Sequence, residues 1–489
     1  MDKKPPIETK NYVKPKKKIK LPKLPRLPKL PKISKNALKK AAKALLVSAA
    51  ALACAALAFA AFWLFHPHQY DEWSLIGLPS CTAEGKESAK CFCGNVGYRA
   101  ISATGHTEIT DLGYAATETE QGLTDGSHCE ICGETLLAQK VIYAGSQGLE
   151  YTVLSGTTCA ITGMGTCKDT ELIISNYYGG YEVTEIGKSA FKDSSALTSV
   201  TIPDSVTSVN IRAFEGCRAL ASISLPDSIT HIGSYAFSDT AYYNNAANRE
   251  GHVLYIGNYL IDAKTSISGD YSVKEGTLAI AAFAFYDCQG LTSVKIPDSV
   301  KVIGSNAFEN CDGLKSAVIG NGVEDIQYWA FYSCNNLKSV TFGEGLKTIG
   351  ERAFLSCAIE KLEIPDSVKS IGFEAFKYCE DLRSVTIGKN ANDIESQAFA
   401  YCSSLTSVTV KEGVTSVARY CFFSCESLTK ITLPKSVTFV DTCAFVGCDK
   451  LADVYYSGSK ADWKKIDVSD NKKLDITSRN CATIHYDYK

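Results

Sequence analysis

Leu291 to Cys311 reads LTSVKIPDSVKVIGSNAFENC, and close variants of this stretch recur along most of the chain. The dipeptide Ala-Phe marks each copy, and Cys-Phe replaces it once. These dipeptides begin at residues 190, 213, 236, 284, 307, 330, 353, 375, 398, 421 and 444. Most copies are therefore 23 residues apart, with one spacing of 22 and one of 48. Such a fixed period predicts a repeat solenoid.

Each copy has the residues that one coil of a solenoid requires. Leu291, Val294 and Ile296 are spaced as the inward residues of a short strand. The Pro-Asp-Ser sequence at 297–299 is typical of a turn, and Gly304 allows a tight bend before the Ala-Phe turn. A single coil cannot bury its own apolar face, so stacked coils must share one core. We expect a strand plus a short turn or helix in each coil.

The pattern L-x-S-V-x-I-P-D-S-V-x-x-I-G-x-x-A-F-x-x-C resembles the BspA-type leucine-rich repeats of bacterial and protist surface proteins. The resemblance implies a leucine-rich-repeat solenoid over residues 183–453, interrupted at 242–280. It also implies an N-terminal cap at 148–182 and a C-terminal cap at 454–489. A surface protein of this kind is expected to adhere to extracellular proteins of a host or of neighbouring cells.

Ala44 to Phe65 reads ALLVSAAALACAALAFAAFWLF, without a charged side chain. A helix of this length spans about 33 Å, enough to cross the hydrocarbon core of a bilayer. Basic residues precede it, so residues 1–43 are expected in the cytoplasm and residues 66–489 outside the cell. We expect a single-pass signal anchor in the cell membrane. A signal peptide cleaved near Ala58-Phe59-Ala60 is the alternative.

The N-terminal tail is strongly basic although the whole chain has a formal charge of −2. Residues 1–43 contain 16 Lys or Arg against Asp2 and Glu8. The run LPKLPRLPKLPKI at 21–33 has Pro at every third position, which is typical of an extended arm. Because the tail adjoins a predicted membrane span, anionic lipid head groups are its nearest polyanion. We expect it to bind anionic lipid or to act only as a topology signal, and we expect no nucleic-acid partner.

Nine copies have Cys three residues after the Phe, at positions 217, 288, 311, 334, 357, 379, 402, 425 and 448. Ser194 and Thr240 stand at the same position in the other two copies. A metal ligand would not tolerate that exchange. We therefore expect buried thiols that act as small apolar residues and form no ladder of disulfides.

Residues 66–147 form a separate extracytoplasmic segment with two degenerate Cys units. The first reads CTAEGKESAKCFCG from Cys81 and is followed by ATGHT; the second reads ETEQGLTDGSHCEICG from Glu118. Three Cys and one His can close a tetrahedral zinc site, and C-x-x-C has the spacing of zinc ligands. A structural zinc ion within 70–140, disulfides and unpaired thiols are three open alternatives. The candidate ligands are Cys81, Cys91, Cys93, His106, Cys129 and Cys132.

Motifs of reaction chemistry are missing from the sequence. It contains no H-E-x-x-H, G-x-S-x-G or P-loop motif. We therefore predict no catalytic residue, no enzyme activity and no cofactor apart from the zinc alternative. Two other functions stay open: a structural envelope spacer or scaffold without a specific ligand, and an enzyme with an unrecognised site in 66–147.

Two groups of residues are candidates for protein binding. The first is a stripe of mostly Ser and Thr that flanks the inward residue of each strand: Ser199, Thr201, Ser222, Ser224, Ser293, Lys295, Ser339, Thr341, Ser384, Thr386, Ser407 and Thr409. Hydroxyl residues are also common in strands, so the alternative is that this stripe is purely structural and has no role in binding. The second group is an aromatic cluster in the interruption: Tyr242, Tyr243, Tyr255 and Tyr259.

Overall fold

The structure is a computed structural model that describes residues 56, 70, 72–91, 94–117, 120–441, 443–468 and 482–489. The predicted basic tail, the predicted membrane helix except for Ala56, and Cys93 lie outside the described residues. Among the residues described, no helix is both long and apolar enough for a membrane crossing.

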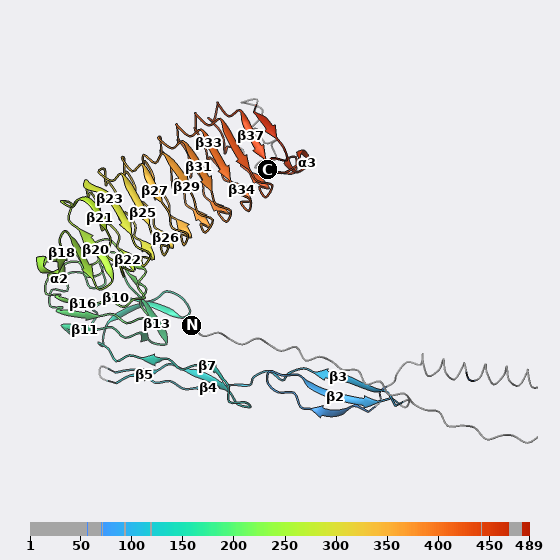
Figure 1. Cartoon of the computed structure of the whole chain (residues 1–489). Helices are drawn as coiled ribbons and strands as arrows, with labels where there is room; N and C mark the ends of the chain where they lie inside the picture. The colour runs from blue at the N-terminus through green and yellow to red at the C-terminus, as the bar shows by residue number, and fades with distance from the viewer. Residues whose placement is uncertain are drawn as a thin grey trace, which may run out of the picture. The chain divides into compact units, whose positions relative to one another are not determined.

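The repeats form a solenoid in which each coil contributes a longer strand and a short strand (Figure 1). The longer strands pair in parallel in three sheets: β11 (Glu171–Ile173), β14 (Ser199–Thr201) and β16 (Ser222–Ser224); β21 (Ser268–Ser272), β23 (Gly290–Ile296), β25 (Ser316–Ile319) and β27 (Ser339–Thr341); and β29 (Lys361–Glu363), β31 (Ser384–Ile387), β33 (Ser407–Val410), β35 (Lys430–Leu433), β37 (Asp453–Tyr456) and β39 (Thr483–His485). The predicted solenoid is confirmed.

The short strands form a second set of ladders that the sequence pattern did not reveal. The first sheet contains β9 (Glu150–Val153), β10 (Thr158–Gly163), β12 (Tyr177–Tyr178), β13 (Tyr181–Ile186), β15 (Ser208–Val209) and β17 (His231–Ile232). The second contains β18 (Arg249–Glu250), β19 (Val253–Ile256), β20 (Tyr259–Ala263), β22 (Ala279–Ile280), β24 (Val302–Ile303), β26 (Asp325–Ile326), β28 (Thr348–Ile349), β30 (Ser370–Ile371) and β32 (Asp393–Ile394). The third contains β34 (Ser416–Val417), β36 (Phe439–Val440) and β38 (Asp467–Val468).

The Phe rings of the Ala-Phe and Cys-Phe dipeptides stack from coil to coil on each side of the interruption, from Phe191 to Phe237 and from Phe285 to Phe445. Phe308, Phe331 and Phe354 are fully buried, and their ring centroids are 4.8 and 5.0 Å apart. The Cys thiols form a parallel ladder. Cys334 donates a hydrogen bond from its sulfur to the carbonyl oxygen of Phe308 at 3.0 Å, and most other ladder Cys make the same contact. Thr240, which stands at the same position, is fully buried and donates from its hydroxyl to the carbonyl oxygen of Phe237 in its own coil at 2.9 Å. The position thus accepts a small hydrogen-bond donor other than a thiol.

The turn around each Ala-Phe dipeptide uses the left-handed backbone conformation twice. The residue before Ala-Phe and the residue before the ladder Cys have φ near +60° in nearly every coil, as in Asn306 (φ 59°) and Asn310 (φ 59°). Glycine and asparagine adopt this conformation with little strain, whereas bulky residues adopt it at a cost. Nearly every coil therefore has two positions at which residues other than glycine and asparagine adopt a strained, left-handed backbone conformation.

The interruption at 242–280 begins with helix α2 (Ala241–Asn244) and the 3-10 helix η1 (Ala246–Asn248), and then forms the antiparallel hairpin β19–β20. Alternate hairpin residues face different cores. Val253 and Leu260 belong to the core of the later coils, whereas Leu254 and Tyr259 belong to the core of the earlier coils. The hairpin is therefore a buried partition with both faces covered.

One coil is a residue shorter than the others, because Ala375 follows Ala353 by 22 residues. The missing residue lies between Cys357 and Lys361, where the other coils have one more residue before the longer strand. The longer-strand ladder stops at this point, since β27 and β29 belong to different sheets. A single deletion thus breaks one face of the solenoid while the short strands β28 and β30 stay paired.

Three small sheets precede the solenoid in the chain. One contains β1 (Ser74–Gly77), β2 (Gly85–Lys90) and β3 (Val96–Ile101). The second contains β4 (Glu108–Asp111), β6 (Gly126–Cys129) and β7 (Thr135–Leu137), and the third pairs β5 (Gly122–Leu123) with β8 (Val141–Ile142). After the last coils, helix α3 (Lys460–Trp463) packs Trp463 edge-on against the buried Tyr456, with ring centroids 5.2 Å apart.

Candidate binding surfaces

The predicted hydroxyl stripe lies in register along the longer strands. Ser293 is paired with Ser316 and then Ser339, while Ser384 is paired with Ser407. The other members flank the inward residues of the longer strands: Ser199, Thr201, Ser222, Ser224, Lys295, Thr341, Thr386 and Thr409. The structure thus aligns the stripe, and its role in binding stays a prediction.

The tyrosines of the interruption do not form one exposed cluster. Tyr259 is fully buried, and its hydroxyl donates to the carbonyl oxygen of Pro226 at 2.6 Å. Tyr255 is also buried, with its hydroxyl 2.9 Å from that of Tyr271. These two residues hold the hairpin partition in place, and their burial leaves little of either side chain for a partner to contact. Tyr242 and Tyr243 are half-buried.

Another surface carries the residue types that dominate protein interfaces. We call it the aromatic ridge; it consists of Trp329, Arg352, Phe373, Lys377, Tyr378, Tyr401, Tyr420 and Phe423. Trp329 and Tyr378 are 37% and 40% exposed, respectively. Tyr378 stacks on Tyr401 at 4.8 Å between ring centroids, and Tyr401 meets Phe423 edge-on at 5.3 Å. The ridge therefore continues from coil to coil.

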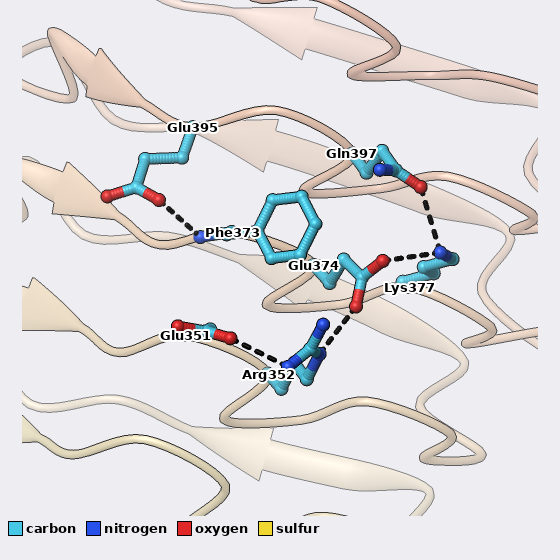
Figure 2. A network of polar contacts seen from close by, with 7 residues as sticks. All are labelled: Glu351, Arg352, Phe373, Glu374, Lys377, Glu395 and Gln397. Carbon is cyan, nitrogen blue, oxygen red and sulfur yellow. Dashed lines mark hydrogen bonds and ion pairs between the residues drawn. The ribbon is translucent and has the colours of Figure 1, made fainter.

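A polar network holds the centre of the aromatic ridge (Figure 2). Arg352 donates from Nε to Glu374 at 2.5 Å, and its guanidinium lies 5.2 Å from the ring centroid of Phe373. Lys377 donates to Glu374 at 2.5 Å and to Gln397 at 2.8 Å. The Lys377 ammonium also lies 5.3 Å from the ring centroid of Tyr378. These contacts orient the cations against the aromatic rings before any partner binds.

Glu374 is nearly buried at 7% exposure. Burial by itself raises the pKa of its carboxyl, but the hydrogen bonds from Lys377 and Arg352 outweigh burial and hold the pKa below its ordinary value. Glu374 is therefore ionised at neutral pH and neutralises much of the positive charge of the ridge. Apart from these paired charges, the surface of the aromatic ridge consists mainly of aromatic side chains.

Several ridge side chains stand on the strained backbone positions. Trp329 has φ 57°, Tyr378 has φ 58° and Tyr401 has φ 60°. A left-handed non-glycine residue costs about 1–2 kcal/mol. Sequence reasoning missed the ridge because it read only the repeated consensus. Comparing the variable residues just before each Ala-Phe and each ladder Cys would have found it.

A shallow groove of about 470 Å³ lies where the longer-strand ladder breaks. Phe342 and Ile364 contribute to its lining, and four of its five charged residues form ion pairs with one another. Lys411 is 2.9 Å from Asp366, and Lys361 is 2.6 Å from Glu363. The groove thus offers a second, more polar surface on the stripe face.

Five of the six predicted metal ligands are described, and Cys93 lies outside the described residues. Ligand atoms of Cys81 and His106 lie within 4.8 Å of each other, and so do the sulfur atoms of Cys129 and Cys132. Cys91 is buried in its own turn, where its carbonyl oxygen accepts the Gly94 N–H at 2.8 Å. The structure therefore gives two close pairs among the described candidates.

Comparison with known proteins identifies the repeats. The family model for the BspA type leucine rich repeat region matches six copies, over residues 184–269, 264–382 and 347–469. A search of curated proteins finds no match.

A search of solved structures also returns matches to this chain. A leucine-rich repeat protein from Bacteroides ovatus is 22% identical, with a TM-score of 0.34, and the match covers 70% of this chain and 98% of that one. A leucine rich cell surface protein from Faecalibacterium prausnitzii is 27% identical, with a TM-score of 0.29 and coverage of 68% and 98%. The pneumococcal vaccine antigen PcpA is 16% identical, with a TM-score of 0.30 and coverage of 70% and 97%.

Proposed function

Because the chain belongs to the BspA-type leucine-rich-repeat family, we propose that it is a membrane-anchored cell-surface protein that binds other proteins and performs no catalysis. Its partners are extracellular proteins of a host or of neighbouring cells. The apolar residues 44–65 hold it in the membrane, and the basic residues 1–43 lie against anionic lipid.

The aromatic ridge is the observation that carries this proposal. Protein interfaces are enriched in Trp, Tyr, Phe and Arg, and a few such residues supply most of the binding energy. Trp329, Arg352 and Tyr378 are residues of this kind, and their neighbours hold them in place. A partner therefore meets side chains that lose little conformational entropy on binding.

The strained backbone of the ridge supports the same proposal. Aromatic residues at left-handed positions lower the stability of the fold relative to Asn or Gly. Their presence at these positions therefore indicates a role other than stabilising the fold. Asn306 and Asn310 show that Asn satisfies both positions within this solenoid. Binding is the purpose that the exposed aromatic faces fit best.

The test uses the full chain displayed on cells, which are applied to surfaces coated with matrix or serum proteins. One variant combines Trp329→Asn, Tyr378→Asn and Tyr401→Asn, which removes the aromatic rings and suits the left-handed backbone. The matched control combines Ser333→Asn, Ser356→Asn and Ser424→Asn, because these residues also have positive φ (55°, 60° and 53°). A third variant removes hydroxyls of the stripe by Ser384→Ala, Thr386→Ala and Ser407→Ala.

We expect the wild type, the serine control and the stripe variant to adhere, and the ridge variant to lose adhesion. Single interface hot spots contribute about 2 kcal/mol or more, so the combined loss should exceed about 30-fold. Undiminished adhesion of the ridge variant would show that the aromatic ridge is not the binding surface. Loss confined to the stripe variant would favour the hydroxyl stripe, and a wild type that adheres to nothing would favour the envelope spacer.

A further inference from the structure

A cavity of about 600 Å³ lies at the N-terminal cap of the solenoid. We call it the tyrosine pocket, because its described lining includes Tyr114, Tyr151, Tyr177 and Tyr178. All of these lining residues belong to one compact unit, Thr107–Lys489. Small-molecule sites are typically cavities of about 300–1,000 Å³. The tyrosine pocket is therefore large enough for a small-molecule ligand.

The aromatic wall of the tyrosine pocket depends on a tight hairpin between β12 and β13. Tyr178 is paired with Tyr181, and the turn residues Gly179 and Gly180 have φ 58° and 86°. Two-residue hairpin turns favour two successive residues of positive φ, and glycine adopts this conformation without strain. Tyr178 stacks on Tyr151 of β9, with ring centroids 3.9 Å apart and ring planes 10° from parallel. Because Tyr178 is still 53% exposed, the stacked pair offers an aromatic surface to a ligand.

A second part of the wall carries the carboxylate of the tyrosine pocket. Tyr114 and Leu123 exchange two backbone hydrogen bonds of 2.8 Å, so the two segments that contain them lie in direct contact. Glycine is needed at position 113, because an added Cβ would lie 2.2 Å from the carbonyl oxygen of Leu123. The Gly113 N–H donates to the carboxylate of Asp125 at 2.7 Å. This hydrogen bond holds Asp125 at the wall of the pocket.

Backbone pairing and hydrogen bonds connect the two parts of the wall. The strand β5, which ends just before Asp125, pairs with β8. The side chain of the buried Asn176 accepts the Tyr143 N–H at 2.7 Å and donates to the Val141 carbonyl at 2.8 Å. The Ser146 N–H also donates to the Ile173 carbonyl at 2.8 Å. The tyrosine pocket is therefore formed before a ligand binds, as is usual for small-molecule sites.

The chemistry of the lining favours an uncharged ligand with several hydroxyl groups. Asp125 is the one charged group among the described lining residues, so an anionic ligand would meet no cation there. Asp125, Gln147 and Ser146 supply a carboxylate, an amide and a hydroxyl, which can all form hydrogen bonds with sugar hydroxyls. The apolar C–H face of a sugar ring can pack on an exposed aromatic ring such as that of Tyr178. Burial raises the pKa of Tyr151, so its hydroxyl stays protonated and adds no charge.

We propose that the tyrosine pocket binds a neutral carbohydrate, with one sugar ring packed on Tyr178 and its hydroxyl groups hydrogen-bonded to Asp125 and Gln147. This site is separate from the aromatic ridge and adds a second kind of ligand to the proposed protein binding. Glycoside hydrolysis generally requires two carboxyl groups, whereas the described lining supplies one. The carbohydrate is therefore bound without being cleaved.

The test applies the full chain to an array of printed neutral and anionic oligosaccharides, and titration calorimetry then measures the affinity for the one that binds most strongly. Tyr178→Ala removes the exposed ring, and Gln147→Ala removes the amide. Both side chains are exposed, so their loss leaves no core cavity. Tyr286→Ala and Gln121→Ala are the matched controls, because both residues are exposed and neither lines the pocket. Far-UV circular dichroism checks that every variant remains folded.

We expect the wild type and both controls to bind a neutral oligosaccharide with the same affinity. Tyr178→Ala should weaken this binding at least about 10-fold, because the sugar loses its aromatic surface. Gln147→Ala should weaken it about 5-fold through the loss of hydrogen bonds. A wild type that binds none of the printed oligosaccharides, or only anionic ones, would overturn the proposal. Unchanged affinity of both pocket variants would also overturn it, since the carbohydrate would then bind elsewhere.

Discussion

Replacing Phe354 by Ala tests how the stacked coils share one core. The ring is fully buried and lies 5.0 Å from Phe331 and 5.2 Å from Phe376, centroid to centroid. It also meets Phe342 edge-on at 5.6 Å. Phe→Ala substitutions in cores cost about 3–5 kcal/mol, and the stack cannot collapse because hydrogen bonds fix the coil spacing. We expect a loss of about 4 kcal/mol, in the middle of that range.

The assay is urea unfolding of the full chain, together with hydrogen exchange measured by mass spectrometry. Coils contact only their neighbours, so protection should fall most in the coils of Phe331, Phe354 and Phe376. Leu355→Ala is the adjacent control, with a half-exposed side chain and an expected cost below about 1 kcal/mol. A cost for Phe354→Ala below about 1 kcal/mol, or an equal loss of protection in all coils, would refute the shared stack.

Three further predictions concern the ridge, the thiol ladder and the short coil. Glu374 has a folded-state pKa below its unfolded value, so its ionised form stabilises the fold above about pH 4.3 and that stability is lost as pH falls through the folded pKa. Urea unfolding of Glu374→Gln should therefore depend less on pH in this acidic range than the wild type. Cys334→Ser should cost less than Cys334→Val, because Ser still donates to the Phe308 carbonyl; equal unfolding free energies would contradict that role. Insertion of one Gly after Ala358 should restore the 23-residue period and pair β27 with β29, so that hydrogen exchange near Lys361 slows; unchanged exchange would contradict the deletion as the cause of the break.

The candidate surfaces were only partly predictable from sequence. Alternation along each strand correctly aligned residues such as Ser384 and Ser407, because a strand alternates its side chains between two faces. Tyr255 and Tyr259 were candidates for binding only as part of an aromatic cluster in the interruption, and both are buried. Their hairpin contacts a different core on each face, and local periodicity does not specify which neighbours cover it.

The aromatic ridge and the metal-ligand pairs show the same limit. Trp329, Arg352 and Tyr378 belong to three successive coils and look unrelated in the sequence. Arg352 contacts Trp329 directly and is linked to Tyr378 through Glu374 and Lys377. Parallel stacking makes this possible because it brings the turns of successive coils about 4.8 Å apart. Cys129 and Cys132 were recognisable from their spacing, but the closeness of Cys81 to His106 depends on a turn that joins residues 25 positions apart.

The repeated pattern is enough to predict the solenoid, its period and its inward residues, since each coil has the same local pattern and can bury its apolar face only by stacking. The tertiary structure decided which side chains of different coils lie together. It created the second strand ladder, the buried hairpin partition, the break at the short coil and the aromatic ridge. These features arise from contacts between coils, and the variable residues that make them have no regular spacing along the chain.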